Sequence, residues 1–228
     1  MMLADDGSER REMDSQTGVE TVRARRHLTS SEIGLMHAGR DDDFCRIRNI
    51  SATGLMAQVY RAISAGDEVD VALKCGQSVR GSVIWTAEHV PDLASRSVRQ
   101  IGVRFDEPID IELFLSSRFT TQTGAVQRWP RLVAECPLKL VLDSGRQISG
   151  RLCDISQRGA KFQTPHGVPG QVRGSLMLRG LPALLGSVRW NEGLRVGMAF
   201  DFAIKLESLV QWNQDRRAEA FACRSGPA

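Results

Sequence analysis

The sequence predicts an all-β protein with short helices, built as two tandem six-stranded antiparallel β-barrels, each followed by an α-helix. Three observations predict this fold: the chain repeats itself at a constant offset, its apolar runs are short and alternate with polar residues, and these runs end at Gly, Asp or Asn. Six short strands per copy are too few for a large sandwich, and closing a sheet into a barrel removes its exposed edges.

An internal repeat organises the chain. Residues 23–54 align without a gap on residues 128–159, so that Leu35 falls on Leu140, 105 positions further on. Two more blocks follow in the same order, the second after a ten-residue deletion in the second copy: Gly-Ser-Val-Ile-Trp at 81–85 on Gly-Ser-Val-Arg-Trp at 186–190, and Ile-Gly-Val-Arg-Phe at 101–105 on Val-Gly-Met-Ala-Phe at 196–200. Matching blocks in one order indicate a duplication.

The repeat sets the expected domains. The linker assignment rests on residues 120–124, which are small and polar and lack apolar periodicity. The expected organisation is a disordered charged tail at 1–19, a first barrel at 20–118, a linker at 119–126, a second barrel with its C-terminal helix at 127–212, and a tail at 213–228.

Each copy contains six runs with strand character. They are 32–37, 44–49, 54–59, 68–73, 78–86 and 101–106 in the first copy, and 138–142, 148–154, 159–163, 174–178, 185–191 and 195–201 in the second. A helix is expected after each set, at 108–116 and 202–212, either plugging its barrel or packing between barrels. The apolar stripe of the second helix comprises Phe202, Leu206, Leu209 and Val210.

The composition excludes several classes of protein. Hydrophobic residues at 42% and charged residues at 25% are typical of a globular protein. A formal net charge of +3 is small for a general nucleic-acid binder, so we expect no DNA or RNA partner. The charged residues 1–14 lack the apolar core of a secretory signal, and the stretch 181–188 is too short to span a bilayer. We therefore expect a cytoplasmic protein without membrane insertion.

Neither a catalytic nor a metal-binding constellation is visible in the sequence. The five cysteines are scattered without a Cys-x-x-Cys pair, so we expect reduced thiols. The four histidines recur at no shared site and have no Ser or Cys partner at triad-like spacing, so we expect no enzyme and no cofactor. The acidic run Asp41-Asp42-Asp43 suggests a solvated hairpin turn rather than a cation site.

A polar hexad lies between two expected strands of each copy, with arginines upstream. Guanidinium groups bind phosphate oxygens or the O6/N7 edge of guanine through paired hydrogen bonds. Asn, Asp and Ser side chains hydrogen-bond base edges, and Gly permits positive φ or close backbone approach. The alternative is an ordinary self-hydrogen-bonded turn beside solvated arginines. The candidate binding residues are Arg23, Arg25, Arg26, Asn49, Ser51 and Gly54 in the first copy, and Arg128, Arg131, Asp154, Ser156 and Gly159 in the second.

These motifs resemble the PilZ domain, a six-stranded barrel that binds the bacterial second messenger cyclic di-GMP with an Arg-x-x-x-Arg arm and an [Asp/Asn]-x-Ser-x-x-Gly turn. The resemblance covers nearly the whole chain twice and includes the Gly-Ser-Val-x-Trp and Gly-x-x-Phe strand ends. It implies a cyclic di-GMP effector that transmits ligand binding to an unidentified protein partner. The alternative is a degenerate tandem adaptor that binds protein partners without nucleotide.

The sequence departs from the family pattern in the arm. Val22 and Gln127 stand where the family has its first arginine. The first copy offers three nearby arginines and the second only two, with Trp129 and Pro130 between them. This difference favours the first copy as the ligand site.

Two further features have alternative interpretations. Trp85 and Trp190 stand at equivalent places, where packing is a better interpretation than base stacking. The stretch through Arg217, and Phe221 beyond it, is either a partner-binding amphipathic helix or a frayed tail.

Overall fold

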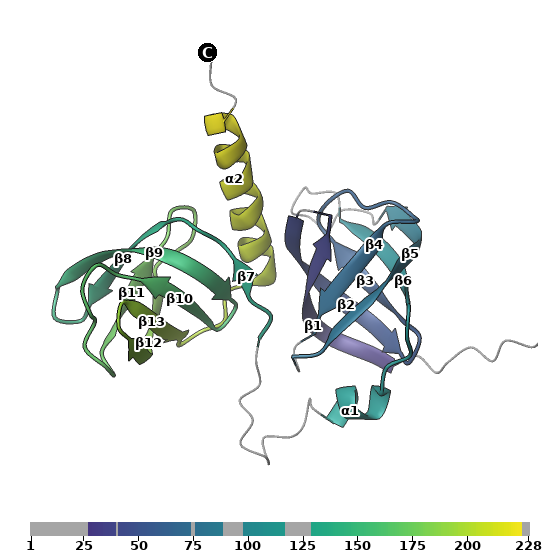
Figure 1. The fold of residues 1–228 in the computed structure, drawn as a ribbon, viewed down its shortest axis with the longest axis horizontal. Helices are drawn as coiled ribbons and strands as arrows, with labels where there is room; N and C mark the ends of the chain where they lie inside the picture. The colour runs from purple at the N-terminus through teal and green to yellow at the C-terminus, as the bar shows by residue number, and fades with distance from the viewer. Residues whose placement is uncertain (1–26, 40, 74–75, 89–97, 117–128, 225–228) are drawn as a thin grey trace, which may run out of the picture.

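The computed structural model describes residues 27–39, 41–73, 76–88, 98–116 and 129–224, which form two closed antiparallel barrels (Figure 1). The predicted fold class is therefore confirmed. The first barrel has the ring order β1-β2-β3-β6-β5-β4 and closes through pairing of β1 with β4. Its elements are β1 (His27–Ala38), β2 (Asp41–Ser51), β3 (Gly54–Val59), β4 (Glu68–Ala72), β5 (Ser78–Glu88), β6 (Arg99–Phe105) and α1 (Ile111–Ser116).

The second barrel repeats this ring as β8-β9-β10-β13-β12-β11 and closes through pairing of β11 with β8. A short additional strand, β7, pairs with the end of β9 and was not expected from the sequence. The elements are β7 (Leu132–Val133), β8 (Pro137–Leu142), β9 (Gln147–Ser156), β10 (Gly159–Gln163), β11 (Arg173–Met177), β12 (Leu184–Glu192), β13 (Arg195–Phe200) and α2 (Leu206–Arg224).

The two helices have different positions (Figure 1). Helix α1 packs on its own barrel, where Phe114 is buried in the barrel core. Helix α2 stands between the barrels and extends to Arg224, well beyond the expected end at 212. The segment after 212 contains Ala, Glu, Gln and Arg, which favour helix, and no Gly or Pro before residue 226. Phe202 was wrongly expected on this helix: it precedes α2 and is 79% exposed.

The first hairpins of the two barrels differ in register by one residue. In the second barrel Arg151 pairs with Pro137, whereas its counterpart Arg46 pairs with Ile33 instead of residue 32. The shifted pairing runs from Glu32 to Ala38, between an irregularity after Leu28 in β1 and the hairpin turn. A one-residue shift reverses the face on which every side chain of a strand lies.

This shift makes the gapless alignment of Leu35 with Leu140 wrong in structural terms. Leu140 is fully buried in the core of the second barrel. In β1 the core of the first barrel instead takes Met36 and Ala38, one residue out of phase, while Leu35 packs outside that core against the cluster of the second barrel. The outer face of the β1–β2 hairpin is consequently apolar.

The apolar cluster of the second barrel continues across to the first. Ile33 and Phe44 of the β1–β2 hairpin belong to it, and Tyr60 packs against it. Phe44 is only 1% exposed although it points away from its own barrel core, where Cys45 and Ile47 lie. The two barrels therefore share a buried apolar contact.

The interior of the first barrel gives a testable prediction. Cys45 is fully buried there, and burial raises the pKa of its thiol to about 12. Since the thiolate is the reactive form, we expect iodoacetamide at pH 8 to modify the half-buried Cys153 well before Cys45 in the folded protein. Peptide mass spectrometry after timed quenching measures both rates, and urea-unfolded protein is the control. Equal rates in the folded protein would contradict this placement.

Candidate functional site

The two polar hexads form matching two-residue hairpin turns. In the β2–β3 turn the Ser51 hydroxyl donates to the carbonyl oxygen of Gly54 at 3.1 Å, and in the β9–β10 turn Ser156 donates to Gly159 at 3.2 Å. The backbone N–H of Thr53 donates in turn to the Ser51 hydroxyl at 3.4 Å. Both serines thus stabilise their own turns, as the alternative interpretation of the motif expected.

The glycine of each turn is required by close backbone approach. A Cβ at Gly54 would lie 2.4 Å from the carbonyl oxygen of Val103, and one at Gly159 would lie 2.5 Å from that of Met198. Neither glycine has a positive φ. Of the two roles that the sequence left open for this glycine, close approach is the one that applies.

A pocket of about 380 Å³ opens beside the turn of the first barrel. The described residues that line it include no carboxylate, and they combine an apolar floor with a few polar groups, as small-molecule sites do. Asn49 is half-buried there, and among the described residues its amide contacts the sulfur of Met56, at 3.9 Å. The lining residues are Asn49, Ser51, Thr53, Gly54, Leu55, Met56, Ile84, Trp85, Gly102, Val103 and Arg104.

The two tryptophans at the repeat's strand ends pack on glycines of the neighbouring strand. A Cβ at Gly102 would lie 2.0 Å from the indole nitrogen of Trp85, and one at Gly197 would lie 2.1 Å from the Trp190 ring. Both tryptophans follow a bulge in the strand register. The packing interpretation is supported, although Trp190 remains 40% exposed on the barrel surface.

The equivalent surface of the second barrel carries an ion triad. Asp154 contacts Arg131 at 2.6 Å and Lys161 at 2.8 Å, and its side chain is only 9% exposed. Arg131 and Asp154 were both candidates from the sequence, whereas Lys161 was missed. The hairpin register could have found it, because a two-residue turn between Ser156 and Gly159 pairs Lys161 with Asp154.

The structure brings together only part of the predicted site. The turn residues of both barrels, with Arg131, take the positions given above. Arg23, Arg25, Arg26 and Arg128 lie outside the described residues, as do Val22 and Gln127.

The acidic run Asp41-Asp42-Asp43 is not simply a solvated turn, as the sequence suggested. Asp43 is 3% exposed and accepts a hydrogen bond from Asn213 of α2 at 3.3 Å. Sequence reasoning missed this contact because the two residues are 170 positions apart. Among the described residues, no group of three or more His, Cys, Asp or Glu side chains is placed to hold a metal ion.

Comparison with known proteins identifies the second barrel. Residues 126–212, which include the second barrel, match the family model described as the PilZ domain. The resemblance stated from the sequence motifs is confirmed. The first barrel has the same ring of strands and the same turn. No curated protein matches the chain by sequence.

Solved structures of low sequence identity also match the chain. The PlzA protein of Borreliella burgdorferi in complex with c-di-GMP is 10% identical with a TM-score of 0.38, covering 84% of this chain and 93% of that one. YcgR in complex with c-di-GMP from Escherichia coli is 12% identical with a TM-score of 0.29, covering 85% and 88%. The inhibitor of motility MotI/DgrA of Bacillus subtilis is 14% identical with a TM-score of 0.32, covering 84% and 99%.

Helix α2, the longest helix in the described part of the chain, contains many charged residues. Among the described residues, no helix has both the length and the apolar character needed to cross a membrane.

The close approach at the turns predicts a difference between two glycine substitutions. Gly54→Ala places a methyl group against the backbone of β6 and should lower the free energy of unfolding by about 1–3 kcal/mol. Gly170→Ala is the matched control, because a Cβ there meets no atom within 4 Å. Urea unfolding followed by circular dichroism measures both variants. Equal stability of the two would show that the turn tolerates a side chain.

Proposed function

We propose that the chain is a non-enzymatic cyclic di-GMP effector whose ligand occupies the pocket on the outer face of the first barrel. The observation that carries this proposal is the pocket beside the Asn49–Gly54 turn, where a neutral amide, an arginine and an indole ring border one hollow. The second-barrel family match supports the ligand class, because the resemblance implies a cyclic di-GMP receptor.

The chemistry of the pocket suits a cyclic dinucleotide. Such a ligand carries two negatively charged phosphates and two guanine edges. Arg104 supplies a guanidinium group at the pocket, and the Asn49 amide offers both a donor and an acceptor to a base edge. Leu55, Met56 and Ile84 add apolar surface against which a purine can lie.

The chain connectivity supports a role for the arginine arm at this pocket. His27 pairs with Ile50, which lies between Asn49 and Ser51 in β2. His27, the first described residue, therefore lies beside the turn. Arg23, Arg25 and Arg26 precede His27 in the sequence, and we propose that they supply the charged contacts to the ligand.

The ion triad makes the second barrel the weaker candidate. Arg131 and Lys161 already contact the buried carboxylate of Asp154, so much of their charge is offset before a ligand arrives. A carboxylate at this place also repels phosphate, whereas the first barrel has the neutral Asn49.

Calorimetric titration of the purified chain with cyclic di-GMP tests this proposal. Loss of one neutral hydrogen bond is worth about 0.5–1.5 kcal/mol, so Asn49→Ala should weaken binding roughly 2–10-fold. Arg26→Ala removes a charge-assisted contact worth about 1.5–3 kcal/mol and should weaken it roughly 10–150-fold. Arg131→Ala is the matched control in the second barrel and should have the smallest effect.

Two outcomes overturn the proposal. Absence of binding heat at high micromolar cyclic di-GMP would show that the chain does not bind this nucleotide. The reverse ranking, with Arg131→Ala most damaging, moves the site to the second barrel.

The second candidate function is a tandem adaptor that binds a protein partner without nucleotide. Val22 and Gln127 favour it, because one guanidinium of the family arm is missing from each copy. Affinity capture with and without cyclic di-GMP separates the two functions. A partner retained only with the nucleotide supports an effector that passes its signal to a protein, and a partner set that ignores it supports the adaptor.

A further inference from the structure

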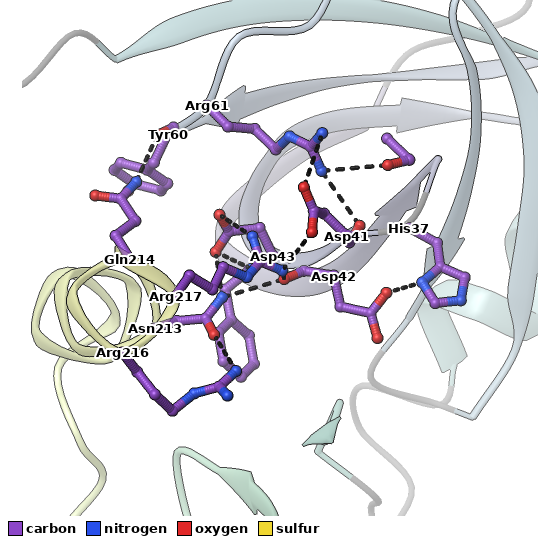
Figure 2. Close-up of polar contacts among 12 residues, drawn as sticks. His37, Asp41, Asp42, Asp43, Tyr60, Arg61, Asn213, Gln214, Arg216 and Arg217 are labelled. Carbon is purple, nitrogen blue, oxygen red and sulfur yellow. Dashed lines mark hydrogen bonds and ion pairs between the residues drawn. The ribbon is translucent and has the colours of Figure 1, made fainter. Parts of the chain in front are cut away.

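A polar contact joins helix α2, which follows the second barrel, to the β1–β2 hairpin of the first (Figure 2). The Asn213 amide donates to the carbonyl oxygen of Asp42 at 3.1 Å and to the carboxylate of Asp43 at 3.3 Å. Arg217 also donates to the Asp42 carbonyl oxygen, and its guanidinium lies 3.8 Å from the Asp43 carboxylate. One helix turn thus binds both the backbone and the side chains of this hairpin.

Two more contacts between α2 and the first barrel extend this polar contact along the helix; together they are called the junction. The Gln214 amide donates to the Tyr60 carbonyl oxygen at 2.7 Å, and Arg46 of β2 forms an ion pair with Glu207 in the first turn of α2. Contacts to the first barrel therefore occur from the first turn of α2 to Arg217.

The same helix also contacts the second barrel, and its apolar side chains belong to the cluster that both barrels share. Leu209, Val210 and Trp212 are nearly fully buried, and the indole N–H of Trp212 donates to the Arg179 carbonyl oxygen at 3.0 Å. Helix α2 thus contacts the second barrel through Trp212 and the first barrel through its polar side chains.

The buried members of this junction depend on one another. Asn213 is 0% exposed and Asp43 is 3% exposed, and burial raises the pKa of the Asp43 carboxyl group. A buried charge left without its partners is strongly destabilising. Separating the barrels hydrates Asp43 but exposes the apolar Ile33 and Phe44. The closed arrangement thus combines an apolar contact with a polar one that fixes its geometry.

The apolar contact is particular to the first barrel. Lys139 and Ser149, on the outer face of the β8–β9 hairpin, are exposed and polar. The corresponding outer face of β1–β2 carries Ile33, Leu35 and Phe44. The β1–β2 hairpin thus carries apolar residues where the second barrel covers it.

We propose that α2 is an intramolecular latch. In this latch Asn213 and Arg217 bind the first residues of β2, Asp41–Asp43, and hold the two barrels together as one body. Opening this latch is the motion that separates the barrels. The proposal does not use the nucleotide site, so it stands or fails independently of the proposed function.

Small-angle X-ray scattering of the full chain without ligand tests the latch. The double variant Asn213→Ala/Arg217→Ala should show a larger radius of gyration and maximum dimension than the wild type. The matched control is Arg179→Ala/Glu219→Ala, which removes an exposed ion pair of α2 that does not involve the first barrel. The control should scatter as the wild type does.

Circular dichroism distinguishes separation of the barrels from unfolding. Both double variants should retain the wild-type far-ultraviolet spectrum, so that a change in dimension reports separation and not unfolding. If the alanine variant does not fold, Asn213→Asp takes its place, because it sets a second carboxylate against Asp43 and should open the latch by repulsion. Wild-type dimensions in a folded latch variant would overturn the proposal.

Discussion

The burial of the outer face of the β1–β2 hairpin is the constraint on which the rest of the architecture depends. The one-residue shift in β1 turns Ile33 and Leu35 away from their own barrel, and Phe44 joins them from β2. Such a patch is costly in water, so another element must cover it. The second barrel and α2 provide that cover, and the polar contacts of Asp43 with α2 fix how they meet. Strand β2 then continues from this junction to Asn49 and Ser51, so one strand links the junction to the candidate ligand pocket.

The β2–β3 and β9–β10 turns have the same backbone structure but different neighbouring side chains. The hydroxyl-to-carbonyl bond of the turn serine and the close approach of the turn glycine are the same in both barrels. Residues around the turn differ, because Asn49 borders an open pocket, whereas Asp154 is enclosed by Arg131 and Lys161. The backbone requirements of the fold have thus been kept while the charges around the turn have changed.

The sequence predicted what depends on local pattern and on the repeat. Alternating apolar residues located the strands, and Gly54 and Gly159 marked the two turns. The register shift in β1 was not predicted, because it leaves the residue spacing of the repeat unchanged. The junction of Asp43 with Asn213 was equally out of reach, since it joins distant segments whose residues look like ordinary solvated polar groups in the sequence. Lys161 was accessible in principle, because the two-residue turn sets it opposite Asp154.

The proposed binding of a cyclic dinucleotide beside the Asn49–Gly54 turn can be followed through the indole N–H signals of the four tryptophans in ¹⁵N-labelled protein. Trp85 lines the pocket, and Trp190 holds the matching place in the second barrel. We expect cyclic di-GMP to shift the Trp85 signal, assigned with the variant Trp85→Phe, and to leave the Trp190 signal in place. A shift confined to Trp190 would contradict it.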